Sequence, residues 1–384
     1  MMLSITVYTL TAIVLFGLGW HVAKREERSL RAGGGELPFA SWEIVLSIIL
    51  FACVAGARYH TGYDHAAYLN RYIMYGTYGY FTRSMECGFD FITIAFVKLG
   101  IHYFFYFALW AALQIGLIYY ALRKHKHLLP WVGALLMTGY YFLMMMNSIR
   151  QSVVMAMLMA SMPLIENRKF FKFLIVTAMG CLIHQSAILL LLVYFIPKRP
   201  RFMDNLKVAL PLFLLFVALG CFPYWMKLLD GVASCASSIS YDRYSRQIEL
   251  ILNGGFRSTH WGPSRIMWII NVIVMIVMGR AVCKFYKSDS LIVRSFTFCY
   301  VGYCLSNLFI NTSPFMLRPF EYLTSFSLIV IASEIHYLYK SRKYVYMVPL
   351  ALMNFSYVYF EIYKAVYRAS DVTLPTLYNL FFLS

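Results

Sequence analysis

Apolar runs recur along almost the whole chain, separated by short basic or polar stretches. A membrane-spanning helix needs about 20 apolar residues, because each residue adds only about 1.5 Å to its length. Runs of this kind begin at Met2, and no stretch between two of them is long enough to bury a soluble core. The pattern predicts an all-α fold, a polytopic transmembrane helical bundle that forms a single integral membrane domain over residues 1–384.

Basic clusters between the runs predict how the bundle is oriented. Loops on the cytoplasmic side carry an excess of Lys and Arg, and six of the loops hold 20 of the 34 Lys and Arg in the chain. Placing these six loops inside gives about 12 passages with both termini outside. The predicted spans are residues 2–22, 42–57, 102–122, 131–146, 151–165, 170–183, 185–197, 208–226, 265–283, 291–310, 319–337 and 344–362.

Two regions do not fit a simple series of full-length spans. Residues 170–197 carry basic clusters at both ends and have to return to the same side, which predicts two short helices that meet near His184. A single long helix there would instead move every later loop to the other face. Residues 89–101 are too short to cross, so we expect them to dip into the membrane or to lie on its surface.

Two of the predicted outer segments, residues 58–88 and 227–264, are long enough to form short helices of their own. The first of them is rich in tyrosine. Tyrosines form a belt at the membrane interface, and in a groove their rings would also stack on the apolar faces of sugars. The sequence leaves both interpretations open.

The composition agrees with a chain that lies mostly in lipid. Hydrophobic residues make up 61% of the chain and charged residues 13%, whereas about a quarter of the residues in soluble domains are charged. A net charge of +17 would suggest a nucleic-acid partner in a soluble protein, but here the basic residues lie in short loops, so no nucleic acid is expected. The first run has its basic residues after it, so we interpret it as a retained helix rather than a signal peptide.

A group of polar residues follows the second predicted span. Arg58 could hold a substrate phosphate and Asp64 a sugar hydroxyl, and Glu86 adds a second outer carboxylate. Tyr68 adds an aromatic ring to the same segment. The structural alternative is an arginine that reaches to lipid headgroups and pairs with the aspartate.

A second group lies in the middle of the chain. Arg150 and Gln151 stand between two apolar runs with almost no loop. A guanidinium is always charged and is costly at such a place without an anionic partner, so we favour a phosphate-binding role. His184 interrupts another apolar stretch and would suit a general base. A buried histidine bonded to a backbone carbonyl is the structural alternative.

Two further arginines, Arg257 and Arg318, belong to predicted outer loops, and Arg318 could also pair with Glu321 to hold two helices together. The chain has no phosphate-binding P-loop, zinc-protease HExxH, nucleophile elbow or dinucleotide GxGxxG sequence. Its carboxylates lack the spacing of a divalent-ion site and its cysteines form no CxxC pair. We therefore expect neither a cofactor nor a metal.

Taken in order, these residues resemble the pattern of the EpsG family, a branch of the Wzy-like bacterial polysaccharide polymerases. The pattern comprises Arg58-x-x-x-Gly62-x-Asp64-x-x-x-Tyr68, Glu86-x-Gly88-Phe89, Asn147-x-x-Arg150-Gln151, Arg168-Lys169-Phe170, His184-x-Ser186 and Arg318. It covers mainly the first half of the chain. Tyr63 stands where Thr or Ser is common and His65 where Tyr is common, which bears on sugar contacts more than on the class of enzyme.

The resemblance implies a GT-C-like, metal-independent membrane glycosyltransferase of the Wzy type, which joins oligosaccharide repeat units carried on undecaprenyl diphosphate. Its product would be an O-antigen, a capsule or an exopolysaccharide. The protein would be a multi-pass protein of the bacterial cytoplasmic (inner) membrane whose active site, with segments 58–88 and 227–264, faces the periplasm. A chain-length regulator of the polysaccharide co-polymerase type would be a candidate partner.

The resemblance also implies roles for individual residues. The acceptor hydroxyl would lose its proton to His184, Asp64 or Glu86, and Arg150 and Arg318 would bind the diphosphate. The substrate-binding set as a whole is Arg58, Tyr68, Arg150, Gln151, Arg257 and Arg318. Two other functions would use similar features: a ligase that moves finished glycan from the same lipid, and a transporter of lipid-linked oligosaccharides. Transporters commonly show an internal repeat, and none is detectable here.

Overall fold

The computed structural model describes residues 1–59, 61–62, 64–79, 86–221, 263–287, 289–310, 314–367 and 377–380, without the side chains of residues 263–264, 314–316 and 379. The chain forms two compact units. The first unit comprises Met1–Phe195 and Ile331–Ser384, and the second comprises Ile196–Val330. Each unit is described by itself.

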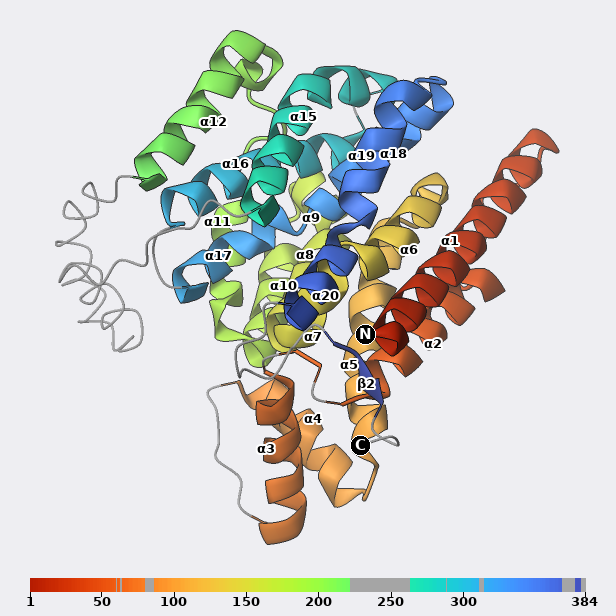
Figure 1. The fold of residues 1–384 in the computed structure, drawn as a ribbon, viewed down its shortest axis with the longest axis vertical. Helices are drawn as coiled ribbons and strands as arrows, with labels where there is room; N and C mark the ends of the chain where they lie inside the picture. The colour runs from red at the N-terminus through yellow and green to blue at the C-terminus, as the bar shows by residue number, and fades with distance from the viewer. Residues whose placement is uncertain are drawn as a thin grey trace. The chain divides into compact units, whose positions relative to one another are not determined.

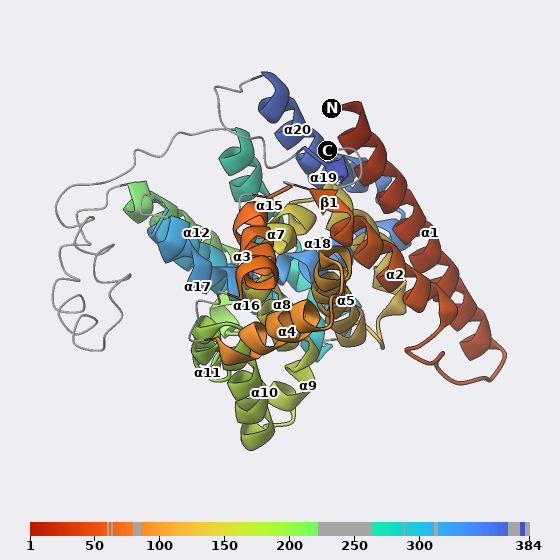
Figure 2. The same ribbon diagram turned by 90° about the horizontal axis from the view of Figure 1, so that it is seen from below.

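The first unit is helical apart from one pair of two-residue strands within the described residues. Its elements are α1 (Met2–Arg31), α2 (Trp42–Gly56), β1 (Arg58–Tyr59), α3 (His65–Tyr78), α4 (Cys87–Lys98), α5 (Tyr103–Ala121), η1 (Lys126–Leu128), α6 (Leu129–Thr138), α7 (Tyr141–Asn147), α8 (Ile149–Ala160), α9 (Met162–Glu166), α10 (Phe170–Ile183), η2 (Gln185–Leu189), α11 (Leu190–Val193), α19 (Tyr344–Phe355), α20 (Tyr357–Tyr367) and β2 (Asn379–Leu380). Figures 1 and 2 show α1 and α2 lying alongside each other, and α3 beside α4.

The second unit contains η3 (Arg201–Asp204), α12 (Leu206–Cys221), α15 (Pro263–Phe285), α16 (Ser290–Leu308) and α17 (Pro314–Thr324), and α18 (Ser327–Lys340) runs from it into the first unit. The buried helix α16 organises it. Arg294 Nη1 donates to the carbonyl of Ile196 at 3.0 Å, and Tyr300 OH donates to the carbonyl of Ala209 at 2.8 Å. Polar side chains of α16 thus tie the preceding segment and α12 to it.

Glycines allow the helices of the first unit to approach closely. A Cβ added at Gly19 of α1 would lie 2.6 Å from the backbone nitrogen of Pro130 in α6, and one added at Gly56 of α2 would lie 2.6 Å from the carbonyl oxygen of Phe104 in α5. Small residues at helix crossings are typical of membrane proteins, because backbones can then make close van der Waals contact. These two glycines therefore make the close crossings possible.

Four helices among the described residues are long and apolar enough to cross a membrane: α1, α5, residues Arg265–Phe285 of α15, and α16. The number rises to 6 if each of two bent pairs is one span, Lys126–Thr138 with Tyr141–Asn147 (62°) and Tyr344–Phe355 with Tyr357–Tyr367 (40°). The chain is therefore an all-α, multi-pass membrane protein. The predicted count of about 12 spans is not confirmed.

Local sequence explains where the observed helices depart from the predicted spans. Helix α1 continues past residue 22 to Arg31 because Glu27 pairs with Lys24 at 3.0 Å and with Arg31 at 2.7 Å on the same helix face. The predicted span 131–146 is bent because the backbone at Gly139 is extended (φ −84°, ψ −167°). The polar ends and the glycine were visible in the sequence, but their effect depends on the packing around them.

The predicted break at His184 is confirmed. Helix α10 ends at Ile183, and His184 adopts an extended backbone (φ −152°, ψ 117°). The continuation differs from the predicted span 185–197: a 3-10 turn, η2, leads into the four-residue α11. This stretch is too short to cross a hydrocarbon layer of about 30 Å as a regular helix.

Candidate active site

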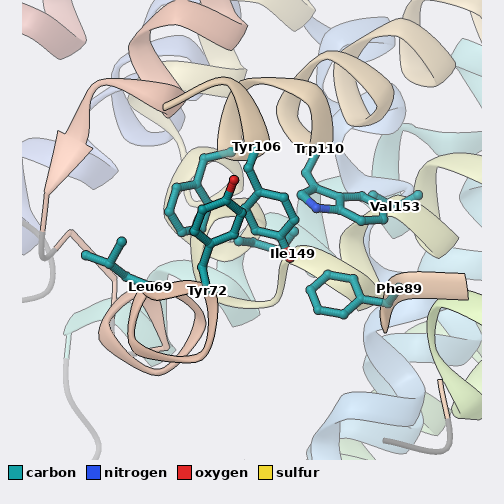
Figure 3. Close-up of a cluster of buried hydrophobic side chains, with 8 residues drawn as sticks. Leu69, Tyr72, Phe89, Tyr106, Trp110, Ile149 and Val153 are labelled. Carbon is teal, nitrogen blue, oxygen red and sulfur yellow. The ribbon is translucent and has the colours of Figure 1, made fainter. Parts of the chain in front are cut away.

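An aromatic cluster fixes the positions of α3, α4, α5 and α8. It comprises Leu69, Tyr72, Phe89, Tyr106, Phe107, Trp110, Ile149 and Val153, all buried (Figure 3). The ring of Phe89 stacks on that of Trp110 with centroids 5.0 Å apart, and Thr93 Oγ1 lies 2.9 Å from Tyr106 OH. Since Phe89 and Ile149 lie in the first turns of α4 and α8, the cluster brings the two helix starts together.

The break between α7 and α8 is held by Gln114, a fully buried residue of α5. Its Nε2 donates to the carbonyls of Met145 at 3.3 Å and Ile149 at 3.2 Å. The Met145 carbonyl belongs to the last turn of α7, where carbonyls lack the usual partner within the helix, and the Ile149 carbonyl belongs to the first residue of α8. Gln114 thereby sets the start of α8. It was not among the predicted site residues, although a glutamine inside an apolar span is a sequence signal for a buried polar contact.

Glu86, Arg150 and His184 meet at these helix starts, although 98 residues separate the first from the last. Glu86 Oε2 accepts a hydrogen bond from Arg150 Nη1. Glu86 Oε1 lies 2.5 Å from His184 Nδ1 and accepts a 3.3 Å bond from the backbone N–H of Gln185. We call Glu86, Arg150 and His184 the carboxylate cluster. Three of the candidates named from sequence therefore form one contiguous site.

Burial makes the carboxylate cluster electrostatically significant. The side chain of Glu86 is 9% exposed, that of His184 is 20% exposed and that of Arg150 is 27% exposed. The carboxylate is therefore shielded from water and neutralised by the guanidinium, while the two groups bound to it keep an open edge.

The contact with Glu86 determines the tautomer of His184. A carboxylate only accepts hydrogen bonds, so Nδ1 carries the proton that is donated to it. In the neutral imidazole the lone pair is then on Nε2, which can accept a proton from a hydroxyl. A carboxylate in this position would also stabilise an imidazolium. A carboxylate that orients a histidine in this way is a recurring arrangement in general-base catalysis.

Two aromatic rings hold the Arg150 guanidinium. Its centre lies 5.6 Å from the centroid of the Tyr68 ring and 5.3 Å from that of Phe89, and Nε donates to Tyr68 OH at 3.4 Å. A guanidinium over an aromatic face is stabilised by the ring quadrupole. Tyr68, predicted to bind substrate, thus lies directly at the carboxylate cluster.

The approach of α4 to α10 depends on Gly88. A Cβ at this position would lie 2.9 Å from Leu182 Cβ and 3.0 Å from the Leu182 carbonyl oxygen. No side chain larger than hydrogen fits there without moving the backbone of α10. Because Gly88 follows Glu86 by two residues and Leu182 precedes His184 by two, this contact sets the distance across which Glu86 meets His184.

Asp64 is attached to the same region through its backbone. Its N–H donates to Asn147 Oδ1 at 3.0 Å, and Asn147 ends α7 just before Arg150. Gly62 has φ 96°, a conformation that favours glycine, and a Cβ there would lie 3.5 Å from the Met146 carbonyl oxygen. The turn that carries Asp64 therefore rests on the end of α7.

Arg58 is 1% exposed and is bound by protein groups. Its Nη1 donates to the Ala55 carbonyl at 2.9 Å and to Met146 Sδ at 2.6 Å, and the guanidinium centre lies 4.8 Å from the Phe107 centroid. Burial lowers the pKa of Arg58 to about 10, so the group remains charged at neutral pH. The contacts seen here attach the chain after α2 to α7 rather than presenting the guanidinium at an open surface.

The remaining predicted residues are placed as follows. Gln151, beside Arg150 in α8, is 3% exposed. Arg318 belongs to α17 in the second unit and is partly exposed there. Arg257 lies outside the described residues. The structure thus brings together Tyr68, Glu86, Arg150 and His184, with Asp64 and Arg58 on adjoining segments of the first unit.

Comparison with known proteins gives one match. A sequence model described as the EpsG family matches residues 42–375, which is most of the chain and includes every residue of the carboxylate cluster. Searches of curated proteins and of solved structures return no match. The chain belongs to the EpsG family of Wzy-like polysaccharide polymerases.

Proposed function

We propose that this protein is a membrane glycosyltransferase that joins oligosaccharide repeat units carried on undecaprenyl diphosphate, at the periplasmic face of the cytoplasmic membrane. Membership of a family of Wzy-like polysaccharide polymerases gives the class of reaction. The observation that carries the proposal is the carboxylate cluster, in which one carboxylate binds both a guanidinium and an imidazole. It places a fixed cation beside an oriented base.

Glycosyl transfer needs these two groups. The acceptor hydroxyl attacks the anomeric carbon of the donor repeat, a glycosidic C–O bond forms, and the bond between that carbon and the diphosphate oxygen breaks. The hydroxyl proton passes to His184 Nε2, and undecaprenyl diphosphate leaves with the electron pair. Glu86 holds the imidazole and stabilises its charged form. Neither Glu86 oxygen is needed as the base, because both already bind cluster members.

Arg150 would stabilise charge on the leaving group. A guanidinium offers a planar fork of donors that fits two phosphate oxygens, and its charge does not depend on pH near neutrality. Fixed donors aimed at developing charge are usually a large part of catalysis. The exposed edge of Arg150, held between Tyr68 and Phe89, can supply them without a metal ion.

The other predicted contacts extend this proposal. Asp64 is the second candidate for the base and would otherwise bind a sugar hydroxyl. Arg318 and Arg257 would add positive charge for the diphosphate, and Arg58 and Gln151 would support the neighbouring segments. Substituting each of these residues singly would test its role without changing the carboxylate cluster.

The test is a turnover assay with the purified protein in lipid nanodiscs and a synthetic repeat unit on an undecaprenyl diphosphate carrier. The proposal predicts release of undecaprenyl diphosphate together with products that grow by one repeat, resolved on a gel. Transfer only to an added non-repeat acceptor would identify a ligase instead. Movement of the lipid across a vesicle membrane without release of the carrier would identify a transporter, and either result would overturn the proposal.

A further inference from the structure

The first unit is closed by a short strand pair whose members are far apart in the sequence. Strands β1 and β2 pair antiparallel, with Arg58 opposite Leu380 and Tyr59 opposite Asn379. The hydroxyl of Thr61, which is fully buried, donates to the Leu377 carbonyl at 3.1 Å, 316 residues away. The chain around residues 377–380 therefore contacts the segment that leads into Asp64.

Tyr378 anchors this pair. The side chain is 2% exposed, and its hydroxyl donates to the carbonyl of Val54 in α2 at 2.5 Å. Its backbone N–H donates to Ser4 Oγ in α1 at 2.9 Å, and its ring meets that of Tyr8 edge to face, with centroids 6.0 Å apart. An isolated two-stranded pair is marginal in water, so these side-chain contacts are what hold β2 in place.

A chain of contacts leads from Tyr378 to the carboxylate cluster. Thr61 is bonded to the β2 segment, and Gly62 follows it against the backbone of Met146. The Asp64 N–H is bonded to Asn147, which ends α7 three residues before Arg150. Arg58, opposite Leu380, is also bonded to Met146. Every link lies in the first unit.

We infer that Tyr378 is a positioning residue: by holding β2 against β1, it fixes the Thr61–Asp64 turn against the end of α7 and so sets the place of Arg150. The inference rests on the proposed function, since it concerns the same site. Release of β2 would leave the helices folded, because their crossings are made by other residues, but would free the turn that carries Asp64. The protein would then bind its substrate but turn it over less often.

The test uses the full chain, with Tyr378→Phe and Tyr378→Ala compared with Tyr367→Phe. The Tyr367 side chain is 65% exposed on α20, so its substitution is a matched loss of one hydroxyl. Opening is measured separately from activity as deuterium labelling, the rate at which the backbone amides of residues 58–59 and 377–380 exchange hydrogen for deuterium, read by mass spectrometry. Exchange of the paired amides requires the strand pair to open.

Removal of one buried hydrogen bond shifts the equilibrium between the closed and the open strand pair about 5-fold towards the open state. Tyr378→Phe should therefore raise the labelling rate about 5-fold. Tyr378→Ala also removes a buried ring and should raise the labelling rate about 100-fold or more. Its kcat should be at least about 10-fold lower than that of the unsubstituted protein, and its KM should stay within about 2-fold. Tyr367→Phe should change none of these values.

The outcomes separate this inference from the proposed function. If the unsubstituted protein produces no polymer, the proposed function fails, while labelling still reports whether Tyr378 holds β2. If the unsubstituted protein is active and Tyr378→Ala leaves labelling or kcat unchanged, the inference is wrong. If Tyr378→Ala does not fold, Tyr378→Phe decides the question, because it keeps the ring. Equal labelling rates for Tyr378→Phe and the unsubstituted protein would then overturn the inference.

Discussion

Replacing Glu86 by glutamine tests whether the carboxylate cluster is catalytic or only structural. Asp90 provides a matched control one helical turn further along α4, because its Oδ1 pairs with Arg71 Nη2 at 2.6 Å. The side-chain exposures are almost the same in the two pairs, 27% and 9% for Arg150 and Glu86, and 26% and 7% for Arg71 and Asp90. Both substitutions keep the shape of the side chain and remove one charge beside an arginine.

Similar burial predicts a similar loss of stability. A hydrogen bond to a charged group contributes about 1.5–3 kcal/mol, and the partial exposure of both arginines keeps each value towards the lower end. We expect Glu86→Gln and Asp90→Asn to lower the free energy of unfolding by about 1–3 kcal/mol each. Any loss of activity that comes from instability alone should therefore be equal in the two variants.

The effects on catalysis should differ. Without the carboxylate, His184 loses the group that fixes its tautomer and stabilises its charged form, so kcat of Glu86→Gln should fall about 100- to 10,000-fold. Asp90→Asn should retain kcat within about 3-fold, since the Asp90 carboxylate pairs with Arg71 and does not orient the His184 imidazole. The assay is the release of undecaprenyl diphosphate by purified protein, with thermal unfolding measured on the same samples. Equal kcat values for the two variants would refute a catalytic role for Glu86.

Substitutions at three further positions test the neighbours of Glu86. Arg150→Lys and Arg150→Ala should both abolish long-chain polymer while protein levels stay normal. The lysine variant keeps the charge, but its ammonium lacks the planar fork of donors. Long chains made by either variant would show that Arg150 does not bind the diphosphate. His184→Gln keeps a donor for Glu86 but has no base, so turnover should fall about 100-fold or more in the carrier-release assay. Gly88→Ala should push α4 away from the backbone of α10 and lower kcat, whereas Gly76→Ala, whose Cβ would meet Val97 at 3.4 Å, should retain activity in the same assay.

Much of the fold was predictable because lipid imposes a strong pattern on the sequence. Apolar runs placed α2, α5, α15 and α16 within a few residues of their observed bounds, since a membrane helix must satisfy its own backbone. Hydropathy could not decide where a run bends. The bends at Gly139 and between α19 and α20 depend on which neighbouring residues pack around the backbone where the helix is interrupted. Hydropathy does not contain this information.

The site was predictable in its parts but not in its connections. Charge inside an apolar chain singled out Arg150 and His184, because such groups are costly there without a purpose. The sequence left Asp64, Glu86 and His184 as alternatives for the base, and the structure shows Glu86 in contact with His184. Tyr378 had no sequence signal at all, because one tyrosine among 31 is distinguished only by what it touches.

The distances along the chain within the carboxylate cluster have a consequence for biosynthesis. Glu86 leaves the ribosome 64 residues before Arg150 and 98 residues before His184. At about 5–20 residues per second, the acidic side chain waits about 3–13 s for Arg150 and about 5–20 s for His184. Burial of a lone carboxylate costs several kcal/mol, so α4 has to remain hydrated until α8 brings Arg150 to Glu86. A nascent chain interrupted before this point carries a carboxylate without the guanidinium that neutralises it in the folded protein.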